Sequence, residues 1–199
     1  MSRRAAAEHP IHDLIAERWS PCGFRDEPVS AEHLRSLFEA ARWAASSYNE
    51  QPWRFIVATR DQPEQHERVL SCLVEANQAW ARRAPVLALA VASRNFTRNG
   101  KPNAAAWYDL GQSVATLSLE ATARGISVHQ MIGILPDRAR ELFGVPDDHD
   151  VATALAIGYA APPDSLPDEI RARDTAPRTR RPLGEFVFSG SWGRKAEFL

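Results

Sequence analysis

A short polar segment ending in proline holds the side chains best suited to binding a small planar molecule. It reads Ser46-Ser47-Tyr48-Asn49-Glu50-Gln51-Pro52-Trp53 and separates an amphipathic stretch from a short apolar run. Its hydroxyls and carboxamides supply both donors and acceptors of hydrogen bonds. A flat heterocycle with mixed polar edges needs such groups, although a capped polar loop has the same composition. Composition by itself fits both interpretations.

A second polar cluster, Arg18-Trp19-Ser20, stands where the first predicted helix breaks. An arginine beside a hydroxyl can bind a phosphate oxygen through charge-assisted hydrogen bonds. Taken alone, the cluster fits a solvated helix end better. The sequence has no G-x-S-x-G elbow, no G-x-G-x-x-G or Walker pattern, and its six histidines lack metal-ligand spacing.

The elements that must position these clusters follow from hydrophobic periodicity and breaker residues. Helices are predicted at 9–18, from an N-cap at Ser30 through Ala41, and at 64–82, 103–124 and 136–143. Strands are predicted at 54–58, 85–91 and 151–159, a strand and turn at 127–134, and loops at 45–52 and 94–103. Helices and strands do not alternate strictly, so the predicted class is α+β, in one domain over 1–199.

The chain changes character after Pro162, where prolines punctuate a polar, arginine-rich stretch. Such a stretch is a poor core element, although Phe186-Val187-Phe188 is typical of a strand. We therefore expect 162–199 to form an arm that packs on a second subunit.

Five segments in order resemble the FMN-dependent nitroreductase family, over about residues 11–190. The polar loop resembles the family's signature loop, with Ala45 where the family usually has proline. The other four segments are Arg18-Trp19-Ser20-x-x-x-Phe24 with Glu27-Pro28-Val29, Asn77 ahead of Ala84-Pro85-Val86, Gly125-Ile126 through Ile132-Gly133-Ile134, and Arg178-Thr179-Arg180-Arg181-Pro182-Leu183.

The resemblance implies a three-layer fold with a central mixed sheet, assembled as a homodimer with FMN at the subunit interface. Arg18, Ser20, Arg178 and Arg180 would hold the phosphate, while Ser46, Ser47 and Asn49 would reach the partner's flavin. Asn77 would bind the pyrimidine edge, and the backbone of Ile132 and Gly133 would face the ring. The full set expected to bind the cofactor is Arg18, Trp19, Ser20, Cys22, Ser46, Ser47, Asn49, Gln51, Asn77, Met131, Ile132, Gly133, Arg178 and Arg180.

No catalytic side chain is expected, because hydride transfer belongs to the cofactor. The implied activity moves hydride from NADH or NADPH through FMN to a nitroaromatic, a quinone or a similar acceptor, with ping-pong kinetics. A non-catalytic flavin reservoir or sensor, an enone or semialdehyde reductase, and a flavin-fragmenting enzyme are the alternatives.

The chain departs from the family pattern at two positions. Many members have a basic residue where this chain has Cys22 and a lysine where it has Trp80. A positive charge there stabilises reduced flavin. We expect the loss of this positive charge to lower the flavin reduction potential, unless Arg25, Arg54, Arg82 or Lys101 supplies it instead. The alternative is that Cys22 and Trp80 only pack in the core, and the two interpretations are about equally favoured.

Bulk properties exclude several other classes. The net charge of -1 gives no basic excess for nucleic acid. Residues 1–10 have no apolar stretch long enough for a signal peptide, and the longest apolar run, 84–92, is too short to span a membrane. Two cysteines, Cys22 and Cys72, suggest reduced thiols in a cytoplasmic protein.

Overall fold

A four-stranded sheet forms the centre of the computed structural model, which describes residues 3–199. The strands are β1 (Trp53–Thr59), β2 (Val86–Ser93), β3 (Ser127–Met131) and β4 (His149–Gly158), in the order β1-β2-β4-β3. Every neighbouring pair is antiparallel, so the expectation of a mixed sheet is wrong for this chain. All eight residues of β2 are buried, as its continuous apolar sequence predicts.

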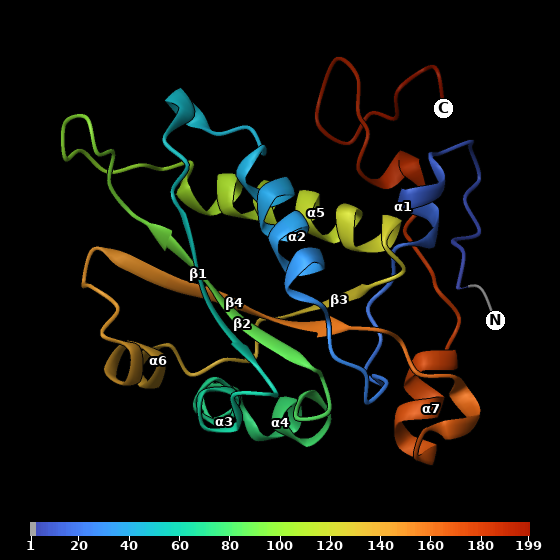
Figure 1. Cartoon of the computed structure of the whole chain (residues 1–199). Coiled ribbons are helices and arrows are strands. Elements are labelled where there is room, and N and C mark those ends of the chain that lie inside the picture. The colour runs from blue at the N-terminus through green and yellow to red at the C-terminus, as the bar shows by residue number, and fades with distance from the viewer. Residues whose placement is uncertain (1–2) are drawn as a thin grey trace.

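Helices cover both faces of the sheet (Figure 1). On one face lie α2 (Ala31–Arg42) and α5 (Ala106–Ala123), and on the other lie α3 (Pro63–Leu70), α4 (Glu75–Ala81) and α6 (Pro136–Phe143). Side chains of β2 alternate between two hydrophobic clusters, one under each helical layer. The predicted α+β class and three layers are therefore confirmed.

Local signals place several helix ends correctly. The Ser30 hydroxyl accepts a hydrogen bond from the His33 amide at 3.1 Å and caps α2. Gly125, with φ of 70°, follows the end of α5 in the left-handed conformation that glycine favours. The first helix is shorter than predicted, because α1 covers only Asp13–Glu17.

The predicted helix at 64–82 is two helices separated at 71–74. There the chain pairs with another segment, since Leu73 bridges Ile134 and the Val74 amide donates to the Gly133 carbonyl at 3.0 Å. Apolar periodicity continues across the break, but these tertiary hydrogen bonds compete with helical ones.

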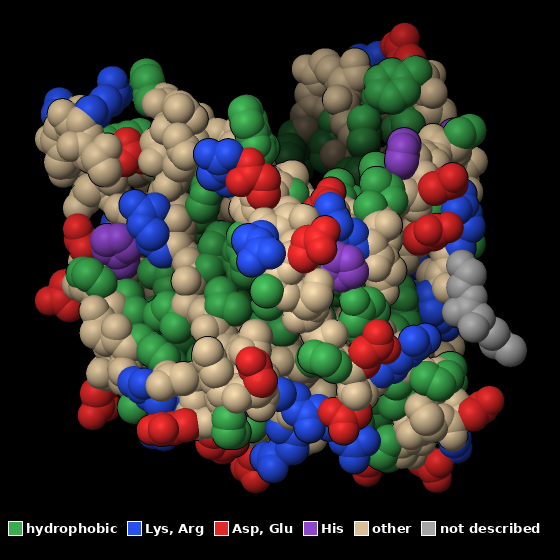
Figure 2. Space-filling view, in the orientation of Figure 1, with side chains coloured by type: hydrophobic (Ala, Val, Ile, Leu, Met, Phe, Trp, Pro, Cys, Tyr) green, Lys and Arg blue, Asp and Glu red, His purple; other side chains and the backbone are tan. Residues whose placement is uncertain are grey.

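The segment after residue 162 packs partly on its own chain. It contains α7 (Asp168–Thr175), which the sequence analysis did not predict, and Leu166 packs against Gly23. The predicted strand at 186–188 is wrong, because only Phe188 forms a bridge, to Lys195. Figure 2 shows the 94–103 hairpin and the C-terminal segment as two projections with a depression between them.

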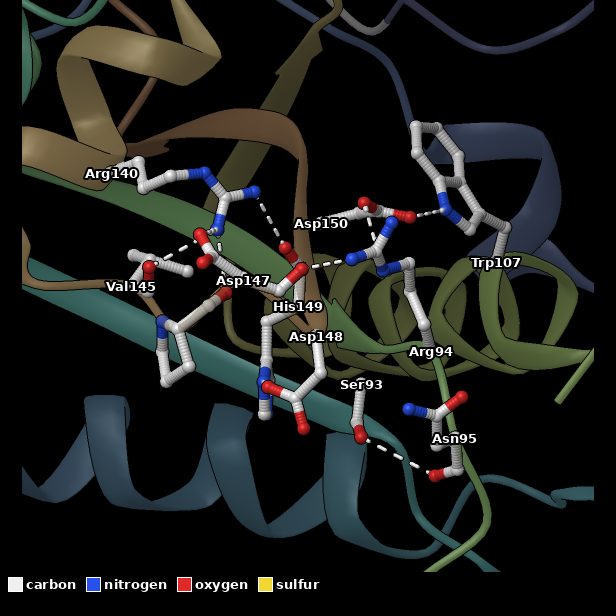
Figure 3. A network of polar contacts seen from close by, with 11 residues as sticks. Ser93, Arg94, Asn95, Trp107, Arg140, Val145, Asp147, Asp148, His149 and Asp150 are labelled. Atoms are coloured by element: carbon white, nitrogen blue, oxygen red, sulfur yellow. Dashed lines mark hydrogen bonds and ion pairs between the residues drawn. The ribbon is translucent and has the colours of Figure 1, made fainter. Parts of the chain in front are cut away.

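A polar network fixes the base of that hairpin (Figure 3). The Arg94 amide donates to the Asp148 carbonyl at 2.9 Å, and Trp107 Nε1 donates to Asp150 at 3.0 Å. Arg140 donates to the carbonyls of Val145, Pro146 and His149. The hairpin therefore leaves the sheet from a well-connected base.

Both cysteines are buried free thiols, as expected. Within residues 3–199, no helix has the length and apolar character to cross a membrane. The same part of the chain has no cluster of three or more residues suited to holding a metal ion.

Candidate functional site

The segment after α1 supplies the first candidate phosphate ligands. Arg18 Nη1 donates to the Ser20 hydroxyl at 3.1 Å, so the two side chains predicted to act together do lie together. Trp19 lies between them in sequence, and the Arg3 guanidinium stacks 5.5 Å from its ring centroid.

The C-terminal segment brings two more arginines to this place. Arg178 donates to the backbone carbonyls of Arg3, Ala16 and Arg18, which ties the segment to α1. Burial lowers the pKa of both Arg18 and Arg178, and the positive charge of Arg180 lowers both further. None of the ion pairs among residues 3–199 includes Arg18, Arg178 or Arg180. The cluster therefore has positive charge that no carboxylate neutralises, which suits an anion.

The polar loop is a strained turn. Tyr48, Asn49 and Gln51 all have positive φ, at 55°, 55° and 52°. Non-glycine residues adopt this conformation at a cost and mostly where surrounding contacts impose it. Those contacts include the Gln51 amide, which donates to the Ser46 hydroxyl at 3.0 Å, and the Ser47 amide, which donates to the buried carboxylate of Asp109 at 2.9 Å.

The loop also contacts the 94–103 hairpin. The Arg98 guanidinium stacks 4.0 Å from the Tyr48 ring centroid, and Phe96 meets the same ring edge-on at 5.8 Å. The Glu50 carboxylate accepts a hydrogen bond from the Thr97 amide at 2.8 Å. Phe96 thus lies beside the polar loop.

Asn77 and Gly133 are brought together by the break between α3 and α4. Asn77 Nδ2 donates to the Gly133 carbonyl at 3.0 Å. This bond does not use the side-chain amide oxygen of Asn77, which can still accept a hydrogen bond. A Cβ at position 133 would lie 2.5 Å from Asn77 Nδ2 and 2.8 Å from Val74 Cγ2. Only glycine permits this approach without displacement. Next to it, Ile132 is 84% exposed, whereas Met131 is buried in the core.

Cys22 and Trp80 are buried, and both contact the half-buried ring of His129. Cys22 Sγ lies 3.8 Å from His129 Nδ1, which donates to the Pro21 carbonyl at 2.8 Å. His129 stacks on Trp80 with ring centroids 4.4 Å apart. Burial raises the pKa of the Cys22 thiol to about 11 and lowers the pKa of His129, so both groups are neutral near pH 7.

Within one chain, the polar loop lies apart from the arginine cluster of Arg18, Arg178 and Arg180. Trp19 lines a cavity with Thr122 and Gly125 at the end of α5, whereas the polar loop is bonded to Asp109 near the start of α5. The helical rise from residue 109 to residue 122 is about 20 Å. Figure 1 shows α1 beside the C-terminal end of α5 and the segment that precedes β1 near its N-terminal end.

The sequence analysis missed three residues that support these groups. Asp109 anchors the polar loop, and its signal was an acidic residue on the buried face of α5. Asp174 is buried and accepts hydrogen bonds from the amides of Cys22 and Gly23 at 2.8 and 2.9 Å. Arg173 lies 6.0 Å from the Trp80 ring centroid. The last two belong to α7, whose sequence carries no clear helical pattern.

Comparison with known proteins identifies the family of this chain. The model of the nitroreductase family matches residues 15–159. An uncharacterized 15.4 kDa protein in the ask 5' region of Mycolicibacterium smegmatis is 31% identical over 146 residues, which are 70% of this chain and 97% of that protein. The major NAD(P)H-flavin oxidoreductase of Aliivibrio fischeri is 31% identical over 208 residues, covering 82% of this chain and 95% of that protein.

A solved structure of an oxidoreductase containing FMN superposes with a TM-score of 0.90 and 34% sequence identity. The superposition covers 98% of this chain and 99% of that one. The chain therefore belongs to the nitroreductase family.

Proposed function

We propose that this protein is an FMN-dependent oxidoreductase that takes hydride from NAD(P)H and passes electrons to an organic acceptor. The observation that carries this proposal is the unneutralised arginine cluster of Arg18, Arg178 and Arg180 beside Ser20, which fits the phosphate of FMN. The flavin oxidoreductase of Aliivibrio fischeri and the similar oxidoreductase that contains FMN support the same cofactor.

The other predicted ligands fit the remaining parts of FMN. The amide oxygen of Asn77 can accept from the pyrimidine N–H, and the absence of a side chain at Gly133 lets Asn77 lie against the backbone next to the exposed Ile132. Both terminal nitrogens of Arg178 already donate to backbone carbonyls. Arg18 and Arg180 would therefore be the main phosphate ligands.

The polar loop would serve the flavin of a second copy. About 20 Å of α5 separates it from the arginine cluster, which is too far for one cofactor to bind both within a chain. A two-fold symmetric dimer brings the loop of one protomer to the cluster of the other. The site is then complete only in the homodimer.

Bound FMN would supply the redox chemistry, between NAD(P)H and an acceptor such as a nitroaromatic or a quinone. The protein's part is to orient both substrates and to limit water. Since donor and acceptor use one pocket in turn, we expect ping-pong kinetics, with parallel lines in double-reciprocal plots. Intersecting lines would show that both substrates bind together.

Binding of FMN to the apoprotein tests the phosphate site directly. Arg180→Gln should weaken FMN binding about 10- to 100-fold, because a charged hydrogen bond contributes roughly 1.5–3 kcal/mol. Arg181→Gln is the control, since Arg181 adjoins Arg180 but is not among the charges that act on Arg18. Quenching of FMN fluorescence measures both, and equal affinities would contradict the assignment.

Anaerobic mixing with NADPH or NADH separates an enzyme from a flavin reservoir. An oxidoreductase loses flavin absorbance within the time of a turnover, and a reservoir does not. Product analysis with a nitroaromatic, an enone and a semialdehyde then separates nitro reduction from the more specialised activities.

A further inference from the structure

Trp80 carries a buried hydrogen-bond donor that has no partner. Its side chain is 2% exposed, and its Nε1 makes no hydrogen bond within the described structure. Buried donors are nearly always satisfied, and leaving one unpaired costs roughly 1–3 kcal/mol. An indole N–H can only donate, so the missing partner must be an acceptor.

The position of Trp80 indicates which acceptor would reach it. Trp80 follows Asn77 by one turn of α4, so both side chains lie on the same side of the helix. Through His129 it adjoins Cys22, two residues after Ser20. Trp80 therefore lies between the candidate phosphate ligands and the candidate ring ligands, and a flavin's pyrimidine edge carries two carbonyl acceptors.

Arg173 adds a positive charge at the same place. Its guanidinium lies over the Trp80 ring at 6.0 Å, and it makes no ion pair among residues 3–199. The buried carboxylate next to it, Asp174, is held by the amides of Cys22 and Gly23, which fixes α7 against the segment that follows Ser20. Arg173 thus reaches Trp80 from an anchored helix.

We infer that Trp80 Nε1 donates a hydrogen bond to a pyrimidine carbonyl of FMN, and that Arg173 provides the positive charge that favours the reduced, anionic flavin. This inference rests on the proposed function. It assigns the positive charge to α7 rather than to Arg25, Arg54, Arg82 or Lys101. Trp80 is then a direct ligand, and Arg173 is a tuning residue that acts through its charge.

The affinity and the reduction potential of bound FMN test the two roles separately. Trp80→Phe keeps an aromatic ring but removes the N–H, and should weaken binding of oxidised FMN about 2- to 10-fold, the loss of one neutral hydrogen bond. Arg173→Gln should weaken binding of reduced FMN relative to oxidised FMN about tenfold, which lowers the two-electron potential by about 30 mV.

Arg171→Gln is the matched control, because Arg171 lies on the same helix and pairs with Asp168 at the surface. It should leave both quantities unchanged. The Arg173→Gln effect on the potential should persist in the Trp80→Phe background, because Asp174 anchors the helix that carries Arg173. Equal affinities and potentials in wild type, Trp80→Phe and Arg173→Gln would overturn the inference while leaving the proposed function intact.

If Trp80→Phe does not fold, the indole N–H resonance of Trp80 in the wild-type protein replaces that variant. It should move downfield when FMN binds, and an unmoved resonance overturns the hydrogen bond. A wild-type protein that fails to bind FMN overturns the proposed function and this inference together.

Discussion

Asp174 shows how a single buried carboxylate can position a binding segment. Each of its oxygens accepts one backbone amide, from Cys22 and from Gly23, two and three residues after Ser20. These two hydrogen bonds fix the backbone at residues 22–23, directly after the candidate phosphate ligand Ser20. A neutral amide at this position could satisfy only one of the two N–H groups.

We predict that Asp174→Asn lowers the free energy of unfolding by roughly 1–3 kcal/mol, because one buried amide loses its acceptor. It should also weaken FMN binding through displacement of Ser20. Asp168→Asn on the same helix is the control, since that side chain is 90% exposed. Urea unfolding measures the change, and equal midpoints for the two variants would refute this role.

Ionisation of Cys22 makes the free energy of unfolding depend on pH in the alkaline range. Burial raises the pKa of its thiol from 9.0 to about 11, with Arg173 acting in the opposite direction and Asp174 in the same one. His129 is the other titratable group in contact with the thiol, and it is neutral at alkaline pH. The unfolded chain therefore ionises at lower pH than the folded chain.

A raised pKa contributes stability that is complete below pH 9 and is lost as the pH rises through about 11. Two pKa units correspond to at most ~3 kcal/mol. Cys22→Ala should remove this part of the alkaline loss and leave a smaller loss due to Cys72, whose pKa is also raised. Chemical unfolding at pH 8, 9 and 10 measures it, and identical pH profiles for variant and wild type would contradict the assignment.

At the scale of elements, the break between α3 and α4 makes the site possible. An unbroken helix over 64–82 would keep its own backbone hydrogen bonds and could not pair with 133–135. The break releases the amide of Val74 to the Gly133 carbonyl and places Asn77 against the same carbonyl. Two candidate ligands far apart in sequence meet for this reason.

Gly133→Ala should disturb this contact, because the new Cβ would lie 2.5 Å from Asn77 Nδ2 and 2.8 Å from Val74 Cγ2. We expect a loss of about 1–3 kcal/mol in stability and weaker FMN binding. In a double-mutant cycle, Val74→Ala should recover part of the loss by removing one of the two crowded atoms. Strict additivity of the two substitutions would argue against the crowding.

At the scale of the whole molecule, the single chain exposes aromatic side chains that suit an interface. Trp192 and Phe198 in the C-terminal segment are 94% and 81% exposed, and Tyr108 at the start of α5 is 72% exposed. Soluble monomers rarely leave groups of large aromatic side chains uncovered. We expect a homodimer that covers them, with two shared sites.

Complementation tests whether each site is shared. Arg180→Gln damages the phosphate site, and Asn49→Gly removes a loop side chain while tolerating its φ of 55°. Each variant alone should turn over poorly. An equal mixture, unfolded and refolded together, should regain about a quarter of wild-type sites, because half of the dimers carry one intact site. A mixture no better than its components would place loop and phosphate ligands in one chain.

The sequence by itself determined the elements with strong local signals. The buried strand at 86–93, the Ser30 cap and the glycine end of α5 each depend on a few neighbouring residues, so local patterns predict them. The same holds for the pairing of Arg18 with Ser20, which are adjacent enough to meet without tertiary constraints.

Only the tertiary structure decided the features that depend on distant partners. Hydrogen bonds to 133–135 break the predicted helix at 71–74, and strand direction follows from connections rather than from apolar pattern. Helix α7 has a polar sequence, and the buried Asp174 anchors it to amides 150 residues away. Arg173 and the unpaired indole of Trp80 meet for the same reason, because non-local packing places them together.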